Sequence, residues 1–366
     1  MRIAGVKLFR YRLPLKRIIT TSRGDHDVRE GIIIELQDES GHVTYGEAAP
    51  LAGFSGETPA QAQEELFTAK PALMGDDLPP GLEKLDGGFE SWLGPLALSP
   101  SARFAIESAV IEMIAAGNEL SLADLLDART DSGIKVNALL SGSTDEVLSR
   151  AADAARDGFT SVKLKIGHLT VGEAIELVSE VRNRIGDMIS LRLDANRAYV
   201  TGDAMELAHR LMPFNAEYIE EPARNLNQLR KLLGEMGAKA RVALDESLLE
   251  IRPEDLSPGY PVKAIVIKPT LLGLEKALSF ARSAEANGIT TVVSSCYESS
   301  VGIRVLAAIA AKAGSDVPAG LDTLEVFADD LLEDPVKIAG GCVSSMYIRE
   351  PVSGIRRDLL EEIADG

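Results

Sequence analysis

Cysteine and histidine are both scarce in this chain, whose 366 residues include two cysteines, Cys296 and Cys342, and four histidines. Two cysteines cannot build the dense disulfide framework of a small secreted domain, and they suit the reducing environment of the cytoplasm. The histidines all lie away from the ends of the strands predicted below: His26, His42, His168 and His209. A zinc site is therefore not expected.

Long apolar runs are also missing, because no segment approaches the roughly 18 apolar residues that a membrane span requires. The N-terminal sequence MRIAGVKLFRYRLPLK mixes basic and apolar residues, which is unlike a secretory signal. Together with the cysteine content, these features predict a cytoplasmic protein.

Basic residues are too few to balance the acidic ones, since 38 Lys and Arg face 56 Asp and Glu and leave a formal net charge of −18. This charge argues against nucleic acid or an anionic membrane as a partner. It does not exclude a small anion bound at a locally basic site. Apolar and charged contents of 45% and 26% are those of an ordinary globular protein, so a disordered chain is excluded.

The length of the chain favours more than one structural unit. Residues 1–130 are typical of an α+β domain, with strands expected at 6–13, 31–36 and 43–50 and helices from about residues 59 and 101. The Gly- and Pro-rich segment 75–95 is expected to be a loop.

From residue 136 onward, seven short apolar segments begin at 136, 161, 190, 218, 241, 264 and 290. Amphipathic stretches such as TVGEAIELVSEVRNRI separate them, and this alternation predicts βα units with a parallel sheet. With a short eighth strand near residue 320, we expect a modified (β/α)8 TIM barrel over 131–325. Residues 326–366 are expected to return to the N-terminal α+β capping domain. An open doubly wound sheet is the alternative, but neither glycine-rich nucleotide fingerprint is present.

Polar residues stand at the carboxyl ends of six consecutive predicted strands, where barrel enzymes carry their chemistry. In SVKLKIG, Lys163 and Lys165 share one face of a strand because side chains alternate. The following strand ends carry Asp194, Glu220 and Glu221, Asp245 and Glu246, Lys268, and Ser294 and Ser295.

Carboxylates that converge from three neighbouring strands repel one another and need a cation. A set of oxygen ligands favours a hard ion, with Mg²⁺ preferred over Mn²⁺ or Ca²⁺. Alternation alone does not decide between Glu220 and Glu221, or between Asp245 and Glu246.

The paired lysines predict a general base. Partial burial and the charge of Lys163 would both lower the pKa of Lys165 toward neutrality. A neutral amine facing a divalent ion suits removal of a proton next to a carboxylate, because the ion would stabilise the enediolate that forms. Lys268, on the opposite wall, would add positive charge or act as a second acid or base.

These residues occur in motifs that resemble the enolase superfamily, muconate-lactonizing subgroup. The matching segments are K-x-K at 163–165, LRLDAN at 191–196, IEEP at 219–222, LDES at 244–247 and IKPT at 267–270. Further segments resemble the o-succinylbenzoate synthase family, so that the resemblance covers nearly the whole chain: YGEAAPLAGFSGET at 45–58, SSCYESSVGIRVLAAIA at 294–310 and GLDTL at 320–324.

The resemblance implies a role for each matching residue. Asp194, Glu220 and Asp245 would hold Mg²⁺, while Lys165 and Lys268 would be the acid/base pair. Lys163, Arg192, Ser294 and Ser295 would contact the substrate, although Arg192 could instead be the structural partner of a carboxylate. The loop at 45–58 would close over the bound substrate.

The implied reaction is the Mg²⁺-dependent dehydration of 2-succinyl-6-hydroxy-2,4-cyclohexadiene-1-carboxylate, a small anionic carboxylate, in menaquinone biosynthesis. N-succinylamino acid racemases and dipeptide epimerases keep the same lysines and ligands, so they remain alternatives. A metal-independent Schiff-base aldolase would also use a lysine at a strand end. The sequence neither indicates nor excludes a homo-oligomer.

Overall fold

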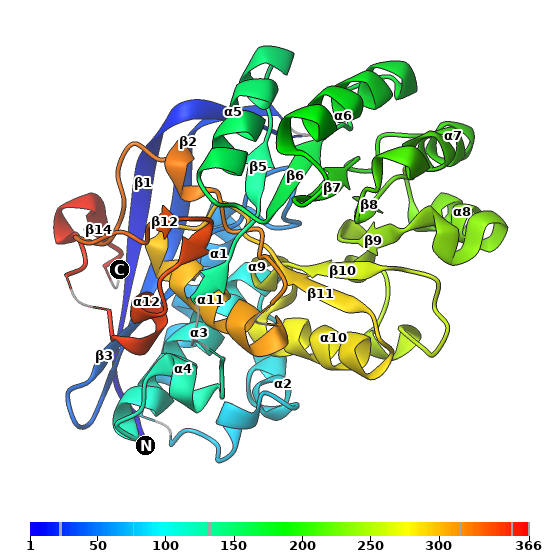
Figure 1. The fold of residues 1–366 in the computed structure, drawn as a ribbon. Helices are drawn as coiled ribbons and strands as arrows, with labels where there is room; N and C mark the ends of the chain where they lie inside the picture. Colours follow the sequence, from blue (N-terminus) through cyan, green and yellow to red (C-terminus); the bar gives the residue numbers. More distant parts are fainter. Residues whose placement is uncertain (22–23, 76, 130–132, 315, 353, 365–366) are drawn as a thin grey trace.

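The computed structural model describes residues 1–21, 24–75, 77–129, 133–314, 316–352 and 354–364 (Figure 1). Its N-terminal part contains a four-stranded antiparallel sheet in the order β14-β1-β2-β3. The strands are β1 Ile3–Thr21, β2 Gly24–Asp38, β3 Val43–Ala48 and, from the other end of the chain, β14 Leu360–Glu362. No helix in the described part of the chain is long and apolar enough to span a membrane.

Both faces of this sheet are covered. In β1, Val6 and Leu8 belong to the main core, whereas Phe9 and Tyr11 belong to a second apolar cluster that includes residues of the C-terminal segment. The helices of this part are α1 Pro59–Leu73, α2 Gly88–Leu93, α3 Pro100–Gly117 and α4 Leu122–Leu125. Helix α3 packs against β2 and β3 and is buried along most of its length.

The segment expected to be a loop, 75–95, is instead partly helical. It contains the 3-10 helix Leu82–Lys84, helix α2, and the start of the 3-10 helix Gly94–Leu96. The Glu275 carboxylate accepts hydrogen bonds from the backbone N–H groups of Gly87, Phe89 and Glu90 at the start of α2. Local Gly and Pro content could not predict this helix, because the N–H groups at its start are hydrogen-bonded by a residue far away in the sequence.

The second part is a curved parallel sheet of seven strands surrounded by helices (Figure 1). Its strands coincide with the seven predicted apolar segments: β5 Ala138–Leu140, β6 Ser161–Lys165, β7 Ser190–Asp194, β8 Tyr218–Glu220, β9 Val242–Leu244, β10 Ala264–Ile267 and β11 Thr290–Val293. Each strand pairs in parallel with the next along the chain. The prediction of a βα barrel is therefore confirmed.

Residues 319 and 320 close the sheet where an eighth strand was expected. Ala319 forms a parallel bridge to Val136 beside β5, and Gly320 forms one to Ser294 at the end of β11. The eighth strand is thus reduced to two isolated bridges. A Cβ atom at Gly320 would lie 2.6 Å from the Ser294 hydroxyl oxygen, so a larger residue there would force the Ser294 side chain to shift.

The helices between the strands are α5 Thr144–Arg156, α6 Val171–Ile185, α7 Thr201–Leu211, α8 Leu226–Met236, α9 Pro269–Leu272, α10 Leu274–Ala286 and α11 Ser300–Gly314. Helix α6 begins with a capping box, in which the Thr170 hydroxyl accepts from the Glu173 N–H and the Glu173 carboxylate accepts from the Thr170 N–H. Further 3-10 helices follow α7, α8 and several strand ends: Met212–Phe214, Gly237–Ala240, Glu246–Leu249, Pro253–Asp255 and Leu324–Val326.

The C-terminal segment contacts both parts of the molecule. Strand β14 pairs with β1, and the hairpin β12 Ile338–Ala339 and β13 Cys342–Val343 pairs with β4 Ile134–Lys135. The segment also contains α12 Met346–Arg349 and the 3-10 helix Arg357–Leu359. The division into 1–130, 131–325 and 326–366 stays a prediction.

Asp330 fastens this segment to the start of α11 and makes stability depend on pH. Its carboxylate accepts from the Ser300 N–H (3.1 Å) and hydroxyl (2.9 Å). Burial raises the pKa of Asp330 from 3.8 to about 6. As pH rises, Asp330 loses its proton at a lower pH in the unfolded chain than in the folded protein. This group's contribution to the free energy of unfolding is therefore present below pH 4 and falls by about 3 kcal/mol as pH rises to 6.

Asp330→Asn is expected to lack this titration. The free energy of unfolding in urea, measured between pH 4 and 7 for both proteins, should show a wild-type value that declines relative to the variant. Parallel pH curves would contradict the assignment.

Candidate active site

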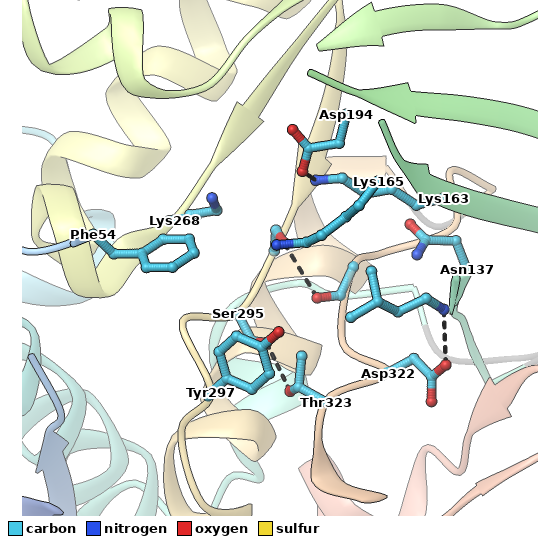
Figure 2. A pocket seen from close by; sticks show the side chains of 13 residues that line it. Phe54, Asn137, Lys163, Lys165, Asp194, Lys268, Ser295, Tyr297, Asp322 and Thr323 are labelled. Carbon is cyan, nitrogen blue, oxygen red and sulfur yellow. Dashed lines mark hydrogen bonds and ion pairs between the residues drawn. The ribbon is translucent and has the colours of Figure 1, made fainter. Parts of the chain in front are cut away.

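A pocket lies at the carboxyl ends of the barrel strands and brings most of the predicted site residues together (Figure 2). It is lined by Phe54, Asn137, Leu139, Lys163, Lys165, Asp194, Lys268, Ser294, Ser295, Tyr297, Gly320, Asp322 and Thr323. Phe54 comes from the N-terminal domain, and the other residues come from the barrel. The pocket offers about 40 Å³ to water-sized molecules, so lining side chains must move when a larger substrate binds.

The acidic part of the site consists of Asp194, Glu220 and Asp245, which are all buried. Asp194 ends β7 and stands beside Glu220, the last residue of β8. Asp245 directly follows β9. Three buried carboxylates from neighbouring strands thus lie at one end of the barrel, although of these only Asp194 lines the pocket itself.

Glu221 has a different environment from Glu220. Its backbone is left-handed, with φ 41°, which ends the alternation of the strand. Its carboxylate accepts hydrogen bonds from Arg197 and from the backbone N–H groups of Asp245 and Ser247. Glu221 therefore braces the β8–β9 connection, while Glu220 contacts the pocket lysine Lys163.

Lys163 and Lys268 are ion-paired with these carboxylates. The Lys163 ammonium lies 2.7 Å from Glu220 Oε1 and 3.0 Å from Asp194 Oδ2, and Lys268 binds Asp245. Burial would lower the pKa of each lysine, but the facing carboxylates outweigh it and hold both pKa values above the usual range. Lys163 is thus held as an ammonium ion by two carboxylates, a pairing that the sequence analysis did not include.

The carboxylates respond in opposite ways to this environment. Burial and repulsion from Asp194 raise the pKa of Glu220 well above its usual value. Burial acts in the same direction on Asp194, but the ammonium groups of Lys163, Lys165 and Lys268 outweigh it, and the pKa of Asp194 is lowered. Burial and repulsion from Asp245 raise the pKa of Glu246 to about 7. Burial and mutual repulsion thus disfavour the charged forms of Glu220 and Glu246 at this end of the barrel.

The carboxylate oxygens of Asp194, Glu220 and Asp245 are hard donors, which suit a hard divalent cation. Within the described residues, no three Asp, Glu, His or Cys side chains form a ready cage for a metal ion, since lysines contact the carboxylates instead. Glu220 Oε2 is nevertheless buried and has no hydrogen-bond partner in the described structure. Carboxylate oxygens from three strand ends, one of them free, are the ligands that Mg²⁺ prefers.

Lys165 differs from the other two lysines. It is half-buried, and within the described residues no ion pair or hydrogen bond holds its ammonium group. Its Nζ lies 5.7 Å from the centre of the Phe54 ring, and Lys268 Nζ lies 5.1 Å from the same centre. Figure 2 shows Lys165 extended into the middle of the pocket, with Lys268 and Phe54 across from it. Lys165 is therefore the lysine most available to a substrate.

Hydroxyl and amide groups form another part of the pocket wall. The Ser295 hydroxyl lies 2.8 Å from that of Thr323, and the Ser294 hydroxyl donates to the Gly320 carbonyl. Asn137, Tyr297, Asp322 and Thr323 were not predicted as site residues. Asp322 and Thr323 lie in the GLDTL segment, and Asn137 shares its strand face with Leu139, so resemblance and alternation each offered a signal.

Arg192 lies outside the set that lines the pocket. Its guanidinium donates to Glu217 (2.9 Å), to Asn137 Oδ1 (3.2 Å) and to the Pro318 carbonyl. This is the structural ion pair that the sequence analysis left open as an alternative. A direct role toward substrate stays a prediction.

The sequence matches two described families. Residues 146–347 match the enolase C-terminal domain-like family, and residues 2–77 match the MenC N-terminal domain family. The o-succinylbenzoate synthase of Enterobacter sp. (strain 638) is 31% identical over 90% of this chain and 93% of that protein. The chloroplastic protein PHYLLO of Arabidopsis thaliana is 32% identical over 82% of this chain, which spans only 19% of that longer protein.

Solved structures share the fold over nearly the whole chain. The L-Ala-D/L-Glu epimerase of Bacillus subtilis, solved with a bound substrate, has a TM-score of 0.84 and 25% identity over 97% of this chain and 99% of that one. The muconate lactonizing enzyme of Mycobacterium smegmatis, solved with muconolactone, has a TM-score of 0.84 at 22% identity over 98% of each chain.

A parallel barrel with a capping sheet, and with carboxylates and lysines at the carboxyl ends of its strands, defines an enzyme of the enolase type, and the chain belongs to the enolase superfamily. Within that superfamily it falls in the muconate-lactonizing subgroup and is similar to o-succinylbenzoate synthases, which are 31% identical to it over about nine-tenths of its length.

Proposed function

We propose that the chain is an o-succinylbenzoate synthase, a lyase that removes water from 2-succinyl-6-hydroxy-2,4-cyclohexadiene-1-carboxylate. Relatives of that name match it over about nine-tenths of both chains. The observation in the site that carries the proposal is the side-chain nitrogen of Lys165, which forms no ion pair with any residue that the structure describes and extends into a pocket bordered by buried carboxylates.

In this proposal, Asp194, Glu220 and Asp245 would hold a divalent cation, for which Mg²⁺ is the first choice and Mn²⁺ the second. A dipeptide epimerase of Enterococcus faecalis, 25% identical, has been solved with Mg and a dipeptide. When bound, the cation would supply Lewis-acid stabilisation of the charge that develops on the substrate carboxylate. The free buried oxygen of Glu220 supports this assignment.

In this mechanism, a lysine side chain of the protein would transfer the substrate proton. Neutral Lys165 would take the proton from the carbon beside the substrate carboxylate, and its ammonium would then give that proton to the departing hydroxide, which leaves as water. The ring becomes aromatic, and no oxidant is consumed. Lys268 faces the other side of the pocket and would stabilise the anion electrostatically. Ser294 and Ser295 would contact the carboxyl groups of the substrate, and Lys163 would add positive charge.

The second candidate is a racemase or epimerase of the same superfamily. It is favoured by the structural similarity to dipeptide epimerases and by the positions of Lys165 and Lys268, which enter the pocket from different sides and both approach the Phe54 ring (Figure 2). Two such lysines could exchange a proton with the two faces of one carbon.

An assay with purified protein separates these functions. We expect the dehydration substrate to be converted to its aromatic product with Mg²⁺, with EDTA removing at least about 99% of the rate and added Mg²⁺ restoring it. Solvent deuterium should enter N-succinylamino acids and dipeptides more slowly than dehydration proceeds. Faster exchange than dehydration would favour the racemase or epimerase. Inactivation by borohydride with substrate, together with indifference to EDTA, would instead indicate a Schiff-base aldolase.

A further inference from the structure

Arg29, on β2 of the capping sheet, is a buried cation outside the lining of the catalytic pocket. Its side chain is 1% exposed, and it is among the largest fully buried side chains of the protein. A buried guanidinium costs much free energy unless its N–H groups are all satisfied. The partners of Arg29 therefore show what this residue stabilises.

All five N–H donors of Arg29 bond to backbone carbonyls. Nε donates to Tyr297 (2.9 Å), Nη1 donates to Glu30 (2.8 Å) and Pro50 (2.9 Å), and Nη2 donates to Ala49 and to Cys296 (3.2 Å). These carbonyls belong to three separate stretches of chain. One is its own strand, one is the root of the loop that carries Phe54, and one is the barrel segment that follows Ser295.

The loop root and the barrel segment that Arg29 contacts each lie within a few residues of a side chain that lines the pocket. The ring of Phe54 lies over Lys165 and Lys268, and Tyr297 lines the same pocket beside Ser295 (Figure 2). Tyr297 also holds a left-handed backbone with φ 62°, which a side chain of this size adopts only when neighbouring contacts impose it. The bond from Arg29 Nε to the Tyr297 carbonyl is such a contact.

We infer that Arg29 is a positioning residue that ties the root of the 49–56 loop to barrel residues 296–297 and so fixes Phe54 over the two lysines. The carbonyls of Ala49 and Pro50 hold the root of this loop, and within the loop the N–H groups of Phe54 and Ser55 donate to the Leu51 carbonyl. The effect on turnover rests on the proposed function, but the effect on the loop does not.

Arg29→Lys is the informative variant, because it keeps the charge but has only three N–H donors and lacks the planar fork. Arg182→Lys is the matched control. Arg182 is also buried and donates to the backbone carbonyls of Gly186, Ile189, Phe214 and Asn215, but it lies on α6 and does not line the pocket. Arg29→Met, which has no donor, extends the series.

In Arg29→Lys, amide hydrogen exchange at Phe54 and Ser55 is expected to be faster by about tenfold, the equivalent of roughly one lost hydrogen bond. Values of kcat/KM for dehydration should fall by about 10- to 100-fold, as misplacement of catalytic groups produces. Arg29→Met should show both effects more strongly. Arg182→Lys should lower the melting temperature by about as much as Arg29→Lys does. Its hydrogen exchange at Phe54 and Ser55 and its kcat/KM should stay within about twofold of wild type.

Equal loop exchange and equal kcat/KM in Arg29→Lys and Arg182→Lys would overturn the inference. Failure of both Arg29 variants to fold while Arg182→Lys folds would also overturn it, because Arg29 would then act on the whole structure. A wild-type protein that does not dehydrate the substrate counts against the proposed function alone, since the exchange comparison uses no substrate.

Discussion

Replacing Lys165 with alanine is expected to lower kcat for dehydration by about 10⁴-fold, the upper end of what one general acid/base supplies, because the same amine takes the proton and returns it to the leaving hydroxide. Of the three pocket lysines, Lys165 has no ion pair among the described residues. Its removal should therefore leave the carboxylates in place. Rapid-quench measurement of the aromatic product gives the rate.

Metal affinity distinguishes loss of the base from loss of the site. Calorimetric titration should show Mg²⁺ binding to Lys165→Ala as tightly as to wild type or slightly more tightly, because a positive charge near Asp194 has been removed. Lys276→Ala, at an exposed position on α10, is the control and should keep its activity. Retention of more than about 1% of kcat in Lys165→Ala would remove this lysine from the mechanism.

Glu220→Gln is expected to weaken Mg²⁺ binding by at least about 100-fold and to lower activity in proportion at subsaturating Mg²⁺. The substitution keeps the shape of the side chain but removes the charge and the free buried oxygen of a proposed ligand. Calorimetric titration with Mg²⁺ measures the affinity, and the Mg²⁺ dependence of the dehydration rate measures the functional consequence.

The neighbouring residue provides the matched control. Glu221→Gln loses the ion pair with Arg197 and weakens bonds to the N–H groups of Asp245 and Ser247, so it should lower the free energy of unfolding by about 1–3 kcal/mol. Its Mg²⁺ affinity should stay within about tenfold of wild type. An equal loss of Mg²⁺ affinity in both variants would contradict the choice of Glu220 over Glu221 as the metal ligand, which rests on the family resemblance.

The fold could be predicted because its determinants are local. Each barrel strand is a short apolar segment, and the helices between them repeat their apolar positions three and four residues apart. The segment 75–95 was predicted wrongly because Glu275 stabilises the start of α2 from far along the chain. The eighth strand was predicted near residue 320, but pairing there is limited to Ala319 and Gly320.

The site was predictable to the extent that strand alternation and motif position determine it. Alternation placed Lys163 and Lys165 on one face, and both line one pocket. It could not show that Lys163 reaches Asp194 and Glu220, because side-chain reach across strands depends on the curvature of the barrel. Arg29 left no signal at all, since its partners are backbone carbonyls, which every residue carries.

A crystal structure with Mg²⁺ and o-succinylbenzoate tests the central claim most directly, namely that carboxylates from three strands gather one divalent cation between two lysines. We expect the ion to be bound by Asp194, Glu220 and Asp245 and to contact the product carboxylate, with Lys165 and Lys268 on opposite faces of the ring. An ion bound elsewhere, or a product outside the pocket lined by Lys165, would contradict it.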